Sequence, residues 1–568
     1  MKKIFNILSL EQKKIFLILI FLSLIISALE FFVLLTIQPI IIFFSNSSTA
    51  INPIFKYLSN YININIFNFF IIFFIIFIFK TFFSIYLSLK KNKFIKNVND
   101  HLSKIIFLQY LNKKYEFFLN SNSSKFIANL IIEVEKFSYR VLDSVLVFVV
   151  ELSIILSVIF FLFYTYFKVT FFLIGFLLLF FYLFIKIFKN KLQVLGNQKV
   201  ISDEAKISDL QKSFFTIQNI KIDNLENFFV GKFIKNNNLS SEKTLILHFL
   251  LDLPKPIMEI LILFLVSISF YFFYYYYQIS KSEILTMLAL FIISMFRVLP
   301  SFNRILASFN SIRFNYSTIN NINQEIISYK ESLRTQKDEI SINNINFKKN
   351  IVLKNIFFSF PNNKKNILKD INLTINKGDY IGLVGDSGSG KSTLLNILCG
   401  LINPNSGYVK VDGTFVKDNL KSFQKKIGYV PQKIYLTDDT FDKNIILGVD
   451  KANFNNDLLN KVIIQSKLEN VINNFSEGIN TKIGEYGSRL SGGQQQRIGI
   501  ARALYKQPEI IIFDEATSAL DPKVEEDILN TIYGLKNNIT AIIVSHKDSV
   551  MSRCDHVYKL DNGILLKK

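Results

Sequence analysis

The first half of the chain is dominated by apolar runs that are long enough to cross a membrane. About 20 consecutive apolar residues span the hydrocarbon core of a bilayer. One run reads IFNFFIIFFIIFIF (66–79) and is interrupted only by Asn68. A single run of this kind can be a buried core helix, but several in succession favour a membrane domain. We therefore predict an all-α domain with six transmembrane spans, near residues 14–44, 63–90, 139–165, 169–188, 247–277 and 283–312.

The charges between the predicted spans indicate how the chain is oriented. The segments 90–138 and 189–246 are long and rich in lysine, whereas the other three loops are short and carry one lysine each. Loops rich in Lys and Arg stay on the cytoplasmic side, and six spans bring both termini to that side. Helical periodicity continues through the two long segments, so we expect long helices that extend into the cytosol. The Met1-Lys2-Lys3 start resembles a signal peptide, but the apolar run that follows is too long, and we interpret it as the first span.

Composition excludes several other classes of protein. Half of the 568 residues are hydrophobic and 60 are Phe, which excludes a disordered or coiled-coil protein. The net charge of +21 is compatible with nucleic-acid binding. However, Lys, Asn, Ile and Phe are enriched together, as an AT-rich coding bias would produce, and we expect no nucleic-acid partner. Two cysteines, Cys399 and Cys554, are too few for a disulfide framework.

The second half of the chain has a different pattern. Short β-branched runs alternate with helical patterns and glycine-rich turns, which indicates an α/β domain with a largely parallel sheet. A polar stretch separates the two halves. We therefore predict a transmembrane domain over 1–320, a linker over 321–338 and an α/β domain over 339–568.

A phosphate-binding motif lies near the start of the α/β domain. Residues 385–393 read GDSGSGKST and match G-x-x-x-x-G-K-[ST] between an apolar strand and a helix, the context that this motif requires. Its glycines let backbone N–H groups approach phosphates, and the helix N-terminus favours their negative charge. We expect Lys391 to reach the β- and γ-phosphates of ATP and Ser392 to bind Mg²⁺. The predicted nucleotide-binding residues of this loop are Gly385, Ser387, Gly388, Ser389, Gly390, Lys391, Ser392 and Thr393.

A second motif supplies two acidic residues. Residues 510–515 read IIIFDE, a buried strand that ends in Asp514 and Glu515. We expect Asp514 to hold Mg²⁺ through water and Glu515 to act as the general base on the attacking water. An acidic turn after a strand is ordinary by itself. Combined with the phosphate loop, it predicts an α/β P-loop domain that binds and hydrolyses ATP.

Residues 490–494 read LSGGQ, and with these motifs the chain resembles the ATP-binding cassette (ABC) transporters. Six spans followed by one nucleotide-binding domain resemble an exporter-type half-transporter. The resemblance implies that Gln432, in YVPQ (429–432), is a catalytic residue that also binds Mg²⁺, and that His546 lies near the γ-phosphate. It places Phe360 where the family usually has a tyrosine that stacks on adenine. It also implies nucleotide contacts from the signature and the D-loop, namely Ser491, Gly492, Gly493, Gln494 and Asp521.

The resemblance further implies that one chain is not enough for an ATP site. In this family ATP lies between the phosphate loop of one domain and the signature of another. This chain has one of each. A homodimer is the simplest arrangement, and a heterodimer with a related half stays open.

Charged residues inside the predicted spans suggest a cargo. Arg297 and Arg304 are seven residues apart and therefore share one helix face, about 10 Å apart. Lys80 is expected at a depth similar to that of Arg297, and the three basic residues together suit a phosphate or pyrophosphate group. The alternative is structural ion pairing with the acids of the spans, which are Glu30, Glu151 and Glu259.

A narrower resemblance concerns the sixth span. Residues 296–305, FRVLPSFNRI, together with Lys80, look like the bacterial ABC flippases that move lipid-linked oligosaccharides for protein N-glycosylation. The segment 54–58 resembles their short outer amphipathic helix. The resemblance implies a homodimeric flippase of the cytoplasmic (inner) membrane. It would use ATP to move an undecaprenyl-pyrophosphate-linked oligosaccharide from the inner to the outer leaflet.

Three other functions stay open at this stage. The first is an ABC exporter of another amphiphile, such as lipid A core, a drug or a peptide. The second is a DNA-associated ATPase with the same motifs, which the six spans disfavour. The third is a gated channel or regulator with the same fold.

Overall fold

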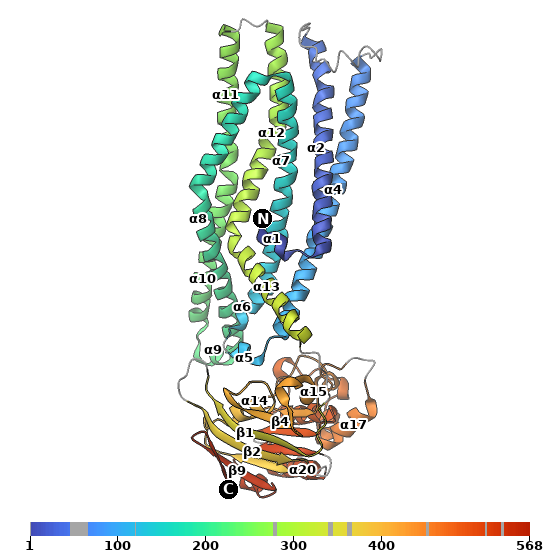
Figure 1. Cartoon of the computed structure of the whole chain (residues 1–568), viewed down its shortest axis with the longest axis vertical. Coiled ribbons are helices and arrows are strands. Elements are labelled where there is room, and N and C mark those ends of the chain that lie inside the picture. Colours follow the sequence, from blue (N-terminus) through green and yellow to red (C-terminus); the bar gives the residue numbers. More distant parts are fainter. Residues whose placement is uncertain are drawn as a thin grey trace. The chain divides into compact units, whose positions relative to one another are not determined.

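The computed structural model divides the chain into two units (Figure 1). Unit 1 comprises residues 1–113 and 121–334, and unit 2 comprises residues 114–120 and 335–568. A short stretch from the first half of the sequence therefore belongs to the second unit. The residues that the structure describes are 2–45, 66–119, 121–276, 281–338, 345–360, 366–449, 454–516, 520–534 and 539–568.

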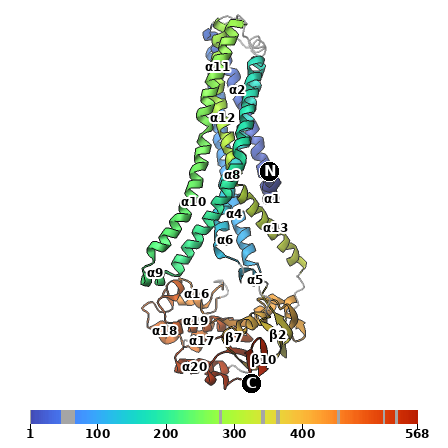
Figure 2. The same cartoon turned by 90° about the vertical axis from the view of Figure 1, so that its left-hand side faces the viewer.

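Unit 1 consists of helices throughout its described residues (Figures 1 and 2). Two short π-helical turns, η1 (Ala128–Glu133) and η2 (Lys136–Leu142), interrupt one of them. The α-helices are α1 (Lys2–Ile7), α2 (Leu10–Ser45), α4 (Ile66–Leu111), α6 (Ser123–Ile127), α7 (Asp143–Thr165), α8 (Phe167–Phe215), α9 (Ile217–Asp223), α10 (Glu226–Asp252), α11 (Pro254–Tyr276), α12 (Lys281–Phe314) and α13 (Tyr316–Asp338).

Four helical stretches in the described residues are long and apolar enough to cross a membrane. They are Leu10–Ile42, Phe67–Leu111, Ser123–Thr165 and Ile284–Phe314. By length and composition, they coincide with four of the predicted spans, the first, second, third and sixth. The other two predicted spans, 169–188 and 247–277, lie in helices α8 and α10–α11 but are not among the four. The predicted count of six is therefore not confirmed.

Several helices continue well beyond the length that a bilayer requires. Helix α4 has 46 residues and α8 has 49. At 1.5 Å per residue they are about 70 Å long, more than twice the thickness of the hydrocarbon core. Helix α4 continues into the lysine-rich segment 90–138, and helix α8 continues into the segment 189–246. The expectation of long helices in these two segments is therefore confirmed. The segment 321–338, predicted as a linker, lies within helix α13.

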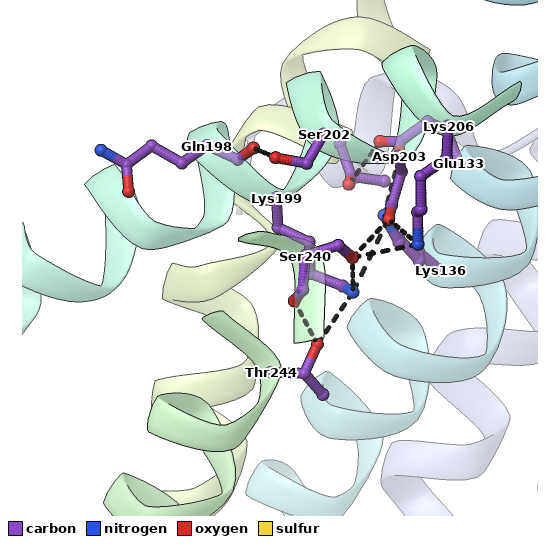
Figure 3. A network of polar contacts seen from close by, with 10 residues as sticks. Glu133, Lys136, Gln198, Lys199, Ser202, Asp203, Lys206, Ser240 and Thr244 are labelled. Atoms are coloured by element: carbon purple, nitrogen blue, oxygen red, sulfur yellow. Dashed lines mark hydrogen bonds and ion pairs between the residues drawn. The ribbon is translucent and has the colours of Figure 1, made fainter. Parts of the chain in front are cut away.

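A buried polar cluster ties α8 to its neighbours (Figure 3). Asp203 lies at its centre, with Lys136 Nζ at 2.9 Å, Lys206 Nζ at 3.0 Å and the Ser240 hydroxyl donating at 2.7 Å. Lys136 also pairs with Glu133 at 3.0 Å, so the cluster joins α8, α10 and the two π-helical turns. Burial by itself raises the pKa of Asp203, but the Lys136 charge and the hydrogen bonds lower that pKa to about 2.

Unit 2 contains two sheets. The larger has six strands in the order β10-β9-β3-β8-β7-β6, in which all neighbours are parallel except β10 and β9. The smaller is antiparallel, in the order β2-β1-β4-β5. The strands are β1 (Asn350–Phe358), β2 (Leu368–Asn376), β3 (Tyr380–Val384), β4 (Ser406–Val411), β5 (Thr414–Phe415), β6 (Ile427–Val430), β7 (Ile510–Asp514), β8 (Thr540–Val544), β9 (His556–Asp561) and β10 (Ile564–Lys567).

Helices cover both faces of the six-stranded sheet. Along β7, Ile510 and Ile512 pack in the core that includes α14 and the smaller sheet, whereas Ile511 and Phe513 pack in the core of the opposite face. This alternation is what a strand buried on both faces requires. The helices of unit 2 are α5 (Tyr115–Leu119), α14 (Lys391–Leu398), α15 (Leu420–Gln424), α16 (Phe441–Ile445), α17 (Asn456–Gln465), α18 (Glu469–Asn473), α19 (Gly492–Tyr505), α20 (Pro522–Tyr533) and α21 (Asp548–Met551).

Candidate functional site

The phosphate loop connects strand β3 to helix α14. Gly385, Gly388 and Gly390 all have positive φ, of 156°, 81° and 107°. A Cβ atom at Gly385 would lie 2.4 Å from the carbonyl oxygen of Leu560. Only glycine fits this backbone path, because φ in this range and the close approach both exclude a side chain. The loop leads directly into the first turn of α14, where the free backbone N–H groups can bind an anion.

Two side chains of this loop fit a bound phosphate. The Lys391 ammonium is buried and donates to the carbonyl oxygens of Gly385 at 2.6 Å and Asp386 at 3.0 Å, which holds it inside the loop. The Ser389 hydroxyl is buried and has no hydrogen-bond partner within the described residues. An unpaired buried hydroxyl is unfavourable unless a ligand or water completes it. Ser389 therefore fits a phosphate oxygen.

The three predicted catalytic residues lie together. The Gln432 side-chain amide donates to Glu515 Oε2 at 2.7 Å, and His546 Nε2 lies 3.5 Å from Glu515 Oε1. They come from three separate segments, after β6, β7 and β8, because parallel strands bring their carboxyl ends to one edge of the sheet. Glu515 has φ of 52°, a conformation uncommon for glutamate. Its N–H donates to the Val544 carbonyl at 3.1 Å, which anchors this turn to β8.

Asp514 ends β7 beside this group. Its Oδ2 accepts a hydrogen bond from the Tyr429 hydroxyl at 2.9 Å. Burial raises the pKa of Asp514, and the Tyr429 hydrogen bond acts in the opposite direction. The YVPQ segment predicts a role for Gln432 but none for Tyr429. A tyrosine on a buried strand signals that its hydroxyl needs a hydrogen-bond partner, but which residue is the partner depends on which strand lies beside it.

The residues predicted to hold Mg²⁺ are Ser392, Gln432 and Asp514. No group of three or more His, Cys, Asp or Glu side chains able to hold a metal occurs in the described residues. Magnesium in nucleotide sites is held by one or two protein oxygens together with phosphates and waters. The Ser392 hydroxyl, exposed at the start of α14, and the Asp514 carboxylate fit that type of site.

The signature residues form the exposed N-terminus of helix α19. Ser491 caps this helix in a capping box, in which its hydroxyl accepts from the Gln494 N–H and the Gln494 side chain accepts from the Ser491 N–H. The structure thus gives Gln494 a capping role. Ser491 and Gly492 are exposed, and Gly493 is half-buried.

The remaining predicted contacts are placed as follows. Phe360 is half-buried and packs edge-on against Phe358, with ring centroids 5.1 Å apart. Asp521 is exposed and precedes α20 as its N-cap residue. The residues 518–519 of the predicted D-loop lie outside the described residues, as does the predicted outer helix over 54–58.

Comparison with known proteins agrees with this geometry. Residues 368–518 match the family model described as ABC transporter. The chain superposes on the solved structure of a bacterial Atm1-family ABC exporter with ATP bound, with a TM-score of 0.75 and 19% sequence identity, covering 97% of this chain and 94% of that one. This chain has the ABC exporter fold.

Relatives in sequence match a more limited region. A Bacillus subtilis protein named for multidrug export, the ATP-binding/permease protein YgaD, is 36% identical over 38% of this chain and 37% of its own length. An export ATP-binding/permease protein of Rickettsia typhi is 39% identical over 38% of this chain and 37% of its own. The ABC transporter ATM1 of Toxoplasma gondii is 38% identical over 36% of this chain and 18% of its own. The chain thus matches well under half the length of each relative.

The membrane half of the ABC exporter fold carries the other predicted site residues. Arg297 Nε lies 2.7 Å from Glu30 Oε1, and Lys80 pairs with the same carboxylate. Arg304 Nε lies 2.9 Å from Glu151 Oε1. The ion pairs named as the structural alternative are therefore present for all three basic residues.

These basic residues differ in how accessible they are. Lys80 is buried, with a side chain that is 10% exposed, whereas the Arg297 and Arg304 side chains are 41% and 57% exposed. Each arginine contacts its acid through Nε, and the structure records no other ion pair or hydrogen bond for either within its described residues. Both arginine side chains thus keep part of their surface outside these ion pairs.

Proposed function

We propose that this chain is one half of an ATP-driven exporter, which works as a pair of chains in the cytoplasmic membrane. The observation that carries the proposal is the combination, in one chain, of a phosphate loop with the Glu515 group and helices able to cross a membrane. Mg²⁺ and Lys391 would neutralise the phosphates of ATP, and Glu515 would accept a proton from the attacking water.

A second copy supplies what one chain lacks in this proposal. Ser491 and Gly492 are exposed at a helix N-terminus, which is a favourable place for a phosphate from across an interface. A homodimer would place two ATP molecules between two copies. The test is a cysteine cross-link in the full chain, with Cys399 and Cys554 replaced.

In that test, one copy carries Ser389→Cys and the other carries Ser491→Cys, both in a Glu515→Gln background. We expect a cross-linked dimer that forms with MgATP and not with EDTA. A cross-link of equal yield under both conditions, or none under either, would contradict the shared ATP site.

The cargo is proposed to be an amphiphile with an anionic head group. Glu30 is shared by Lys80 and Arg297, so two bases face one buried carboxylate and leave an excess positive charge. The partly exposed guanidinium ends are suited to bidentate contact with phosphate. An undecaprenyl-pyrophosphate-linked oligosaccharide is the finer candidate, on the resemblance of residues 296–305. The names of the relatives favour export in general, and an uncharged or cationic drug is the competing cargo.

The two cargo classes can be distinguished by Arg297→Ala and Arg304→Ala. For an anionic cargo, each lost contact weakens binding by about 10- to 100-fold. The variants should then lose stimulation of ATP hydrolysis by a pyrophosphate-linked lipid and keep their basal hydrolysis. If the arginines only pair with acids, the same variants should be poorly folded and be rescued by Glu30→Gln or Glu151→Gln. Folded variants that are still stimulated normally would rule out an anionic cargo at these residues.

A further inference from the structure

We propose that Tyr429 is a positioning residue for magnesium, because its hydroxyl holds the Asp514 carboxylate in the orientation that receives a magnesium-bound water. This inference rests on the proposed role of Asp514 in the ATP site. It assigns a function to a side chain for which the motifs described above give no role.

The sheet topology brings the two side chains together. Strands β6 and β7 are parallel neighbours, with Tyr429 paired in register with Ile512. Asp514 lies two residues after Ile512 and so projects from the same face of β7. That face packs in the core that contains α14, the helix that starts at Lys391, and Tyr429 packs against the same core. Tyr429 and Asp514 therefore lie on the same side of the sheet as α14, and the Tyr429 hydroxyl reaches the acidic end of β7.

The hydrogen bond from Tyr429, at 2.9 Å to Oδ2, is the one side-chain hydrogen bond that the structure records for Asp514 within its described residues. The terminal torsion of an aspartate has a broad energy profile, so a single donor decides which way the carboxylate turns. Oδ2 accepts this hydrogen bond, and Oδ1 would be free to accept one from a metal-bound water. Groups that orient a metal-binding side chain in this way typically change metal affinity by 10- to 100-fold when they are removed.

The uncharged hydroxyl suits this task better than a cation would. The nearby ammonium of Lys391 is engaged by the carbonyl oxygens of Gly385 and Asp386. A basic partner on Asp514 would neutralise the charge that attracts Mg²⁺. A phenol fixes the geometry and leaves the full negative charge in place.

The alternative role for Tyr429 is packing alone, and Tyr429→Phe separates the two. Phenylalanine keeps the ring in the core and removes only the hydroxyl. Tyr558→Phe is the matched control. Its ring packs against the same core, on β9, and the structure records no hydrogen bond from its hydroxyl within the described residues.

The experiment measures nucleotide binding by the full chain in nanodiscs, which does not depend on turnover. A non-hydrolysable ATP analogue is titrated first in EDTA and then at increasing MgCl₂. For Tyr429→Phe we expect unchanged affinity in EDTA and a rise of about 10-fold in the Mg²⁺ concentration that gives half-maximal tightening. Tyr558→Phe should match the wild type in both.

Two results would overturn the inference. One is a wild-type Mg²⁺ requirement in Tyr429→Phe. The other is an equal loss of affinity in EDTA and in Mg²⁺, which would show that the hydroxyl supports only the packing. A wild-type chain whose nucleotide binding ignores Mg²⁺ would instead contradict the proposed role of Asp514 itself, and the inference with it.

Discussion

The backbone conformation of Glu515 determines the direction in which its carboxylate points. Its φ of 52° lies in the left-handed region, which is unfavourable for a residue with a long side chain. Such strain persists only where the surroundings hold it, as the bond from its N–H to Val544 does here. The result is a carboxylate turned toward the Gln432 amide and the His546 ring, at the point where the strand ends.

We predict that Glu515→Gln lowers ATP hydrolysis by at least about 100-fold, because the amide keeps the shape of the side chain but cannot accept the proton. Binding of ATP should be retained. Phosphate release and nucleotide binding measured on the same preparation check both statements. Glu526→Gln, at an exposed position of α20 that is 62% accessible, is the control and should hydrolyse ATP normally. Turnover near wild type in Glu515→Gln would assign the base to another residue, with His546 next.

At this scale the local motifs were predictable and the long-range contacts were not. The loop 385–393 is specified by its own glycines and lysine. The Tyr429–Asp514 contact depends on which strands are neighbours in the sheet, and these residues are 85 positions apart in sequence. A one-residue change of register would turn Tyr429 to the opposite face. The pattern of β-branched runs predicts strands but does not determine the order in which they pair.

At the scale of elements, the ion pairs and hydrogen bonds of the Asp203 cluster (Figure 3) connect α8 with α10 and with the π-helical turns. Turns of this kind often occur at functional sites in helices. Because the folded pKa of about 2 lies below the ordinary value of 3.8, ionised Asp203 stabilises the folded state. The difference corresponds to about 2 kcal/mol at neutral pH. This stabilisation is complete above about pH 5 and is lost as the pH falls from about 4 toward 2.

We therefore predict that Asp203→Asn lowers the free energy of unfolding by at least about 2 kcal/mol at pH 7, because Lys199 and Lys206 lose their buried counter-charge and Lys136 keeps only Glu133. Thermal unfolding in detergent should show the same Tm difference from pH 8 to pH 5. The difference should shrink below pH 4, as far as the protein can be followed. Glu226→Gln, in an exposed pair with Lys221, is the control and should leave the Tm unchanged. A wild-type Tm for Asp203→Asn would mean that the cluster adds no stability.

The end of helix α8 carries an exposed apolar pair, with Phe214 at 70% and Phe215 at 66% accessibility. Exposed apolar side chains of this kind favour contact with another protein surface. We predict that Phe214→Ser with Phe215→Ser spares basal ATP hydrolysis and abolishes stimulation by cargo. Phe228→Ser, exposed to 66% on α10, should retain both and serves as the control. Equal loss of basal and stimulated hydrolysis would indicate a folding defect and would contradict a role in coupling.

The pairing of the intramembrane charges could not be chosen from sequence. Apolar helices pack in many registers, since Phe, Ile and Leu provide little that distinguishes one face from another. Both interpretations of Arg297 therefore fitted the sequence equally well. The structure adds the pairs with Glu30 and Glu151, while the exposure of both arginines leaves a cargo contact compatible with them.

For the whole molecule, the chain superposes on an ABC exporter structure at only 19% sequence identity. This fold therefore depends more on the pattern of apolar and polar residues along the chain than on the identity of particular residues. Long apolar runs followed by a phosphate loop and an acidic strand were enough to predict an all-α membrane domain and an α/β P-loop domain. The number of spans was harder to predict, because four helical stretches of the described residues qualify and the remaining two predicted spans are less clear.

The most direct test of the account is transport by the purified chain in proteoliposomes. The probes are a fluorescent pyrophosphate-linked oligosaccharide lipid and a lipophilic cationic dye, each followed across the bilayer with wild type and with Glu515→Gln. We predict that MgATP drives at least one probe across with the wild-type chain. That movement should stop in Glu515→Gln and in EDTA. Wild-type chains that hydrolyse ATP while neither probe moves faster than with Glu515→Gln would contradict ATP-driven export of an amphiphile.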